Sequence, residues 1–92
     1  MNIFSCARSS GNGSQAITSS GYTFLPKQTV SRVIIVNNAS GAVAVSVQQD
    51  AAVAAIIVPA GQSFTFNGLQ DASQLGLQAA SGTPTITYRW EH

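Results

Sequence analysis

The spacing of turns constrains the fold of this chain more than any other feature. From Tyr22 onward, short runs of β-branched and aromatic residues are separated by Asn, Gly and Pro about every eight to twelve residues. Runs of this length and composition favour strands over helices. The sequence therefore predicts an all-β, single-domain antiparallel β-sandwich, of the jelly-roll or Greek-key type, with about seven or eight strands.

Alternation within the runs predicts which side chains form the core. Residues 42–48 place three valines on one face and smaller or polar residues on the other. By the same pattern, we expect four aromatic residues to be core: Phe64, Phe66, Tyr88 and Trp90. The expected strands are 22–25, 29–36, 42–48, 53–58, 63–67, 74–78 and 85–91.

Two local features qualify this assignment. Residues 37–41, Asn-Asn-Ala-Ser-Gly, are typical of a hairpin turn between the strands at 29–36 and 42–48. Residues 50–58 contain four alanines and have a helical alternative. The Val and Ile content of that segment and the following Pro59 favour a strand.

The first 21 residues differ in composition from the rest. Ser, Gly and Asn dominate residues 9–14 and 19–21, and such stretches are typical of loops. Residues 1–21 are expected to form an N-terminal arm, or a first strand at residues 2–8 followed by a Gly/Ser-rich loop. The β-sandwich domain is expected over residues 22–92.

The chain carries very little charge. Its 92 residues include four Lys or Arg and three Asp or Glu, with a formal net charge of +1. Free monomeric domains usually present about a quarter to a third of their surface as charged residues. Weak charge therefore favours association with other proteins, and the scattered Lys and Arg disfavour nucleic-acid binding.

The sequence also disfavours membrane insertion and export. Its longest apolar run, residues 51–58, is far below the roughly 20 residues that span a bilayer. The few residues before Cys6 lack the basic and apolar regions of a signal peptide. We expect assembly in the cytoplasm.

No pattern in the chain predicts catalysis or metal binding. Cys6 and His92 are the only residues of their types, and the three carboxylates lie in different segments. A nucleophile with an oriented base, or a metal site, requires more such groups than these. We therefore expect no enzyme, no metal, no cofactor and no small-molecule substrate.

Two strands are apolar on both faces. In residues 33–36 and 56–58, successive side chains point to opposite sides of a sheet, yet all are Val or Ile. A two-layer core covers one face only, so the other needs a second copy, another protein, or the loop at residues 9–21. The expected contact residues are Val33, Ile35, Ile56 and Val58, with Ala42 and Ala44 as a flat approach surface and Ile3 and Phe4 at the tip of the arm.

Three segments carry a family resemblance. They are Val-Pro-Ala-Gly-Gln-Ser-Phe at 58–64, Gly-Leu-Gln-Asp-Ala-Ser-Gln-Leu at 68–75 and Gly-Thr-Pro-Thr-Ile-Thr-Tyr-Arg-Trp at 82–90. In the general character of their sequence, and not through an exact motif, residues 30–90 resemble small virion proteins of tailed bacteriophages. The resemblance implies a β-sandwich or jelly-roll cement protein on the capsid, which bridges subunits of the major capsid protein or another virion protein. It also implies self-association, with a homotrimer favoured and a dimer as the second choice.

Two other functions remain open from the sequence. A tail, collar or fibre component of a virion would share this composition. A small glycan-binding module would need exposed aromatic side chains, whereas Tyr88 and Trp90 are expected to face inward.

Overall fold

The computed structural model describes residues 10–38, 43–50 and 55–92. Within these ranges the chain forms eight strands and one short 3₁₀ turn, η1 (Ala72–Gln74). The strands are β1 (Ser10–Ala16), β2 (Thr23–Phe24), β3 (Arg32–Val36), β4 (Val45–Gln49), β5 (Ile56–Val58), β6 (Ser63–Asn67), β7 (Leu75–Ala79) and β8 (Thr85–Glu91).

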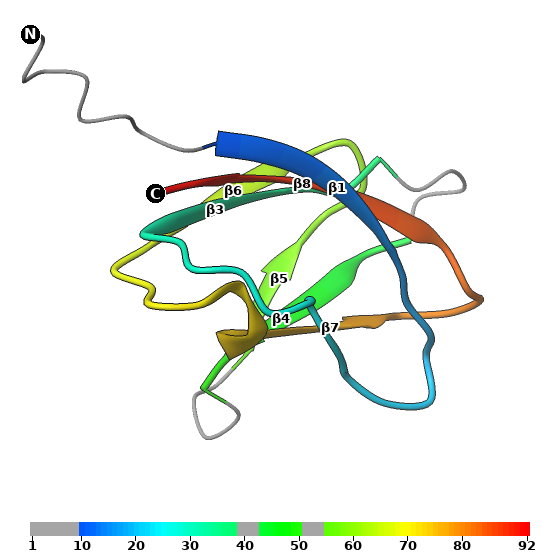
Figure 1. The fold of residues 1–92 in the computed structure, drawn as a ribbon. Helices are drawn as coiled ribbons and strands as arrows, with labels where there is room; N and C mark the ends of the chain where they lie inside the picture. Colours follow the sequence, from blue (N-terminus) through cyan, green and yellow to red (C-terminus); the bar gives the residue numbers. More distant parts are fainter. Residues whose placement is uncertain (1–9, 39–42, 51–54) are drawn as a thin grey trace, which may run out of the picture.

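The strands form two stacked antiparallel sheets, visible as two layers in Figure 1. One sheet has the order β1-β8-β3-β6 and the other β2-β7-β4-β5. Thus β1 pairs with β8, β2 with β7, β3 with β6, and β4 with β5. This nested pairing is what results when one long antiparallel ribbon rolls up, and it defines a jelly roll. The prediction of a small all-β sandwich is confirmed.

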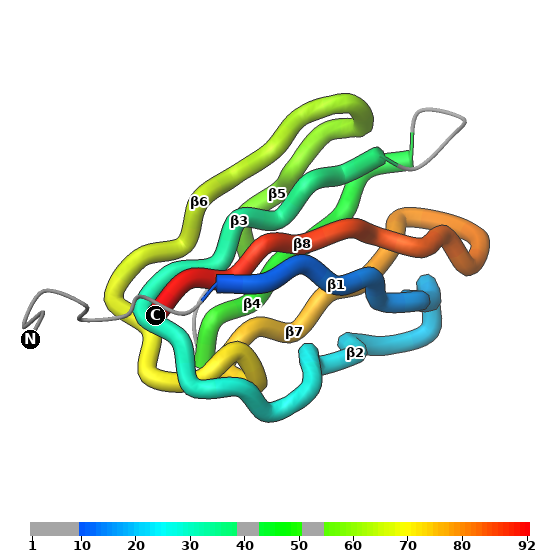
Figure 2. Tube along the Cα trace, turned by 45° about the horizontal axis from the view of Figure 1, so that its top comes forward, coloured from blue at the N-terminus to red at the C-terminus, as the bar shows by residue number. Residues whose placement is uncertain are grey.

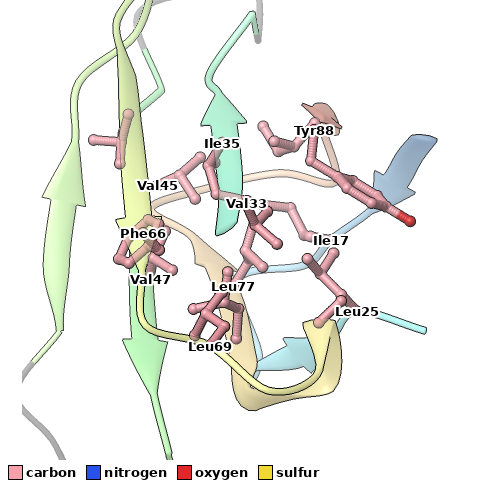
Figure 3. Close-up of a cluster of buried hydrophobic side chains, with 14 of the residues drawn as sticks. Ile17, Leu25, Val33, Ile35, Val45, Val47, Phe66, Leu69, Leu77 and Tyr88 are labelled. Carbon is pink, nitrogen blue, oxygen red and sulfur yellow. The ribbon is translucent and has the colours of Figure 1, made fainter. Parts of the chain in front are cut away.

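The core lies between the two sheets. Val33 and Ile35 of β3 and Ile86 of β8 face Val47 of β4 and Leu77 of β7, and all five are almost completely buried. Figure 3 shows several of these side chains in a single cluster. Burying one Val, Leu or Ile contributes about 1.5–3 kcal/mol, so this layer is the main source of stability.

The hairpin predicted between the strands at 29–36 and 42–48 is wrong. β3 and β4 belong to different sheets and do not pair with each other. Asn37 is fully buried, and its Nδ2 donates to the carbonyls of Val43 (2.9 Å) and Val58 (2.8 Å). The buried side-chain amide of Asn37 therefore fixes the crossing. The presence of Asn and Gly in a segment does not by itself determine which strands it connects. Residues 39–42 lie outside the described residues.

The Gly/Ser-rich segment predicted as a loop or arm is partly a strand. β1 pairs along seven residues of β8, with Gly11 opposite Trp90 and Gly13 opposite Tyr88. β1 therefore extends the sheet beside β8 and does not fold over the outer face of β3. Residues 1–9, which include Ile3, Phe4 and the alternative first strand, lie outside the described residues.

Candidate interaction surface

Three of the predicted contact residues are core residues. Val33, Ile35 and Val58 are each 1% exposed or less, which corrects their assignment to a contact surface. Their strands are apolar on both faces as predicted, but the face that was expected to contact a partner is the one that faces the core. The residues that point outward from β3 are Ile34 and Val36, both half-buried, and from β5 it is Ile57, which is 56% exposed.

The other predicted contact residues lie at the periphery or outside the described part. Ile56 is 38% exposed and Ala44 is half-buried. Ala42 lies outside the described residues, as do Ile3 and Phe4. Ile56 is therefore the predicted contact residue that the structure places at an exposed apolar position.

Exposed apolar side chains gather along one side of the sandwich. Ile56, Ile57 and Phe64 lie on β5 and β6, the edge strands of the two sheets on that side, and we call these three residues the β5–β6 flank. Figure 2 shows β5 and β6 together along one side, with β1 and β2 on the opposite side. Phe24 of β2 is the remaining large exposed hydrophobic residue among those described.

Phe64 and Ile56 face inward yet remain exposed. Phe64 is opposite Ile35 in the β3–β6 register and Ile56 is opposite Val47 in the β4–β5 register, so both share the face of core residues. Each lies on the last strand of its sheet, where no further strand covers it. Phe64 is 42% exposed, and its ring packs against Phe66 with a centroid separation of 4.8 Å. Phe64 and Ile56 thus form an open border of the core, whereas Ile57 of the flank points outward from β5.

On the opposite side of the sandwich, the chain crosses between the sheets after β1, and the large exposed hydrophobic residue there is Phe24 of β2. After β1, the Ile17 amide donates to the Pro84 carbonyl (3.0 Å), and the Thr18 carbonyl accepts from the Ala79 amide of the other sheet (2.9 Å). Ile17 is completely buried at this crossing. The two sides therefore differ in the amount of exposed apolar surface, because among the described residues three large hydrophobic residues are exposed at the β5–β6 flank and one, Phe24, on the opposite side.

The free edge of β6 presents unpaired backbone groups. The backbone N–H of Asn37 donates to the Gln62 carbonyl (2.9 Å), and this bond continues the β3–β6 register by one residue pair. Hydrogen-bonded residues alternate along an antiparallel ladder, so Phe64 and Phe66 bond to β3. The backbone groups of Ser63, Thr65 and Asn67 consequently point out of the sheet.

The edge strands carry no charge. β1, β2, β5 and β6 contain no Lys, Arg, Asp, Glu or Pro. On the described strands the charged residues are Arg32, Arg89 and Glu91, on the central β3 and β8, where Glu91 forms ion pairs with both arginines. Natural sheets commonly block their edges with charges or proline, and these edges lack both devices.

The aromatic residues do not form an exposed platform on β8. Phe66 and Tyr88 are buried, as predicted for core residues, whereas Trp90 is half-buried against the core and Phe64 is exposed. The exposure of Phe64 was missed because alternation identifies the inward face but not the position of a strand within its sheet.

Two further kinds of feature are absent from the described residues. Within 10–38, 43–50 and 55–92, no three His, Cys, Asp or Glu residues gather as a metal-binding group. In the same ranges, no helix has the length and apolarity needed to cross a bilayer.

Neither a scan against protein-family models nor a search of curated proteins finds a match to the chain. The class of the protein therefore follows from its fold and surface. It is a small jelly-roll sandwich with one open apolar flank and uncharged sheet edges.

Proposed function

We propose that this chain is a structural virion protein of a tailed bacteriophage, a capsid cement or decoration protein that self-associates and bridges capsid subunits. The β5–β6 flank is the observation that carries the proposal, because exposed apolar residues beside an uncharged edge suit a surface that neighbouring proteins cover. The virion context comes from the resemblance of residues 30–90. The protein is made and assembled in the host cytoplasm.

The mechanism is mechanical. A protein that binds the assembled lattice and not free subunits stabilises that lattice, because the bound sites must be vacated before the shell separates. Several modest contacts made by one oligomer add through avidity. The outer face of the β1-β8-β3-β6 sheet, with Ile34 and Val36 at its centre, offers a second contact surface toward the capsid.

The copy number of the chain in purified virions tests this proposal. Quantitative mass spectrometry against the major capsid protein should give a fixed ratio that reflects the capsid lattice, in hundreds of copies. Particles stripped of the chain should rebind the purified protein and gain resistance to heat. A few copies per particle would instead assign the chain to the tail, collar or fibre, and absence from the particle would overturn the virion role.

A further inference from the structure

We propose that two copies of this chain pair through β6, antiparallel about a two-fold axis at Thr65, so that their β1-β8-β3-β6 sheets join into one continuous sheet. This inference rests on the self-association proposed above and names its surface. The partner is a second copy of this chain.

The sequence of β6 is nearly symmetric about its centre. It reads Ser-Phe-Thr-Phe-Asn, with a polar residue at each end, Phe64 and Phe66 next, and Thr65 in the middle. A two-fold interface must be complementary to itself. When this strand pairs antiparallel with its own copy, Thr65 meets Thr65, each Phe64 meets Phe66 of the second copy, and Ser63 meets Asn67.

The backbone hydrogen-bonding groups of β6 point in the direction that this pairing requires. Ser63, Thr65 and Asn67 direct their amide and carbonyl groups out of the edge, as the bond from Asn37 to Gln62 implies. With Thr65 on the axis, these three residues form the hydrogen-bonded pairs of the new ladder, with about six hydrogen bonds in total. Groups that now point to water would thus all find partners.

Side chains on both faces suit a second copy. On the outer face, Ser63, Thr65 and Asn67 are exposed and uncharged, so no like charges oppose each other at the axis. On the inner face, Phe64 comes beside Phe66 of the second copy, and aromatic cross-strand pairs of this kind are stabilising. The flank residue Ile56 lies at the same open border and loses solvent contact as well.

The other sheet edges do not combine these features. β2 has two residues and β5 has three, too few for an extended ladder. β1 has seven residues, but those facing inward are Gly11, Gly13 and Gln15, so pairing there would cover no apolar side chain of the edge strand. Among the described strands, β6 alone joins a five-residue free edge to an exposed aromatic ring.

A disulfide tests the two-fold register directly. In a Cys6→Ser background, Thr65→Cys places the single thiol on the proposed axis, where Cα atoms of a hydrogen-bonded pair are about 5.5 Å apart, within disulfide range. Under mild oxidation we expect most of this variant to form a covalent dimer. The matched control, Ser14→Cys on the other edge of the same sheet, should remain mostly uncrosslinked. Equal crosslinking of the two variants would overturn the register.

Solution mass tests the interface without a new covalent bond. We expect the wild-type protein to show twice its chain mass of 9.5 kDa by light scattering, across a dilution series. Thr65→Lys sets two like charges together on the axis and should halve that mass, while Ser14→Lys should leave it unchanged. Circular dichroism checks that both variants fold.

The outcomes separate this inference from the proposed function. A wild-type monomer or trimer, or a Thr65→Lys variant that stays dimeric, would overturn the β6 pairing, whatever the copy number of the chain in virions. A β6 dimer absent from particles would support the pairing and reject the virion role.

Discussion

At the scale of single residues, two glycines make β1 possible. A Cβ built on Gly11 would lie 2.7 Å from the Trp90 ring, and one on Gly13 would lie 2.6 Å from the Tyr88 ring. The rings of β8 therefore lie across the backbone of β1 and cover it. A strand of poor intrinsic propensity is stabilised in this way by aromatic contacts from its neighbour.

Gly13→Ala should destabilise the protein by about 1–3 kcal/mol, because the buried Tyr88 ring has to shift to admit a methyl group. Ser14→Ala is the matched control, since Ser14 is exposed on the opposite face of the same strand, and it should change stability by less than about 0.5 kcal/mol. Urea unfolding measures both. Equal stability of the two variants would show that Tyr88 does not hold this position.

Asn37 is the second position where one side chain organises its surroundings. Asn37→Ala removes the donor to the Val43 and Val58 carbonyls, and we expect a loss of about 1–3 kcal/mol. The neighbouring Asn38 is exposed and donates to the Thr87 hydroxyl, so Asn38→Ala should cost much less. Urea unfolding of this pair tests whether the buried amide, and not the turn composition, fixes the crossing from β3 toward β4.

At the scale of elements, η1 is held by reciprocal hydrogen bonds. The Asp71 carboxylate accepts from the Ser73 amide (2.9 Å) and hydroxyl (2.8 Å), and the Gln74 side chain accepts from the Asp71 amide (3.0 Å). The Ser73 amide and then its hydroxyl lower the pKa of Asp71, and the Gln28 amide adds to this effect. The capped turn thereby joins the chain before β3 to the start of β7.

A lowered pKa gives this cap a defined pH dependence. The folded protein binds the Asp71 proton less tightly than the unfolded chain, so the stabilisation is complete above the unfolded pKa of about 3.9 and is lost as pH falls through the lower folded value. Asp71→Asn keeps a capping side chain but removes the charge. The drop in urea midpoint between about pH 6 and pH 2.5 should therefore be smaller in the variant. The same drop in both proteins would contradict this account.

Some elements could be predicted because their determinants are local. The bounds predicted for β6 and β8, 63–67 and 85–91, match the structure, since alternation and flanking turn residues specify them. The inward face of β3 could not be predicted, because both of its faces are apolar and only the opposite sheet selects Val33 and Ile35. β1 was missed because its stability comes from rings about 75 residues away in the chain.

The candidate surface was predicted only in part for the same reason. The exposure of Ile56 can be predicted from its two-faced strand. The exposure of Phe64 cannot, because alternation does not reveal that β6 is the last strand of its sheet. Edge position is a property of the topology, and the nested pairing of eight strands sets it.

At the scale of the whole molecule, charge and apolar surface are separated. The charged residues of the described strands lie on the central β3 and β8, whereas the exposed Ile56, Ile57 and Phe64 lie on the edge strands β5 and β6. Association through the edge therefore brings together backbone groups and apolar side chains. Electrostatic attraction contributes little to such an interface.

This separation predicts that self-association is nearly independent of salt. Raising NaCl from about 50 mM to 500 mM shortens the Debye length from about 14 Å to 4 Å and would weaken an interface held by exposed charges. For pairing through β6, we expect the dissociation constant from sedimentation equilibrium to change by less than about threefold. A tenfold weakening would place the contact at the Arg32, Arg89 and Glu91 cluster on the outer face of the sheet instead, and Glu91→Gln would then reproduce the effect at low salt.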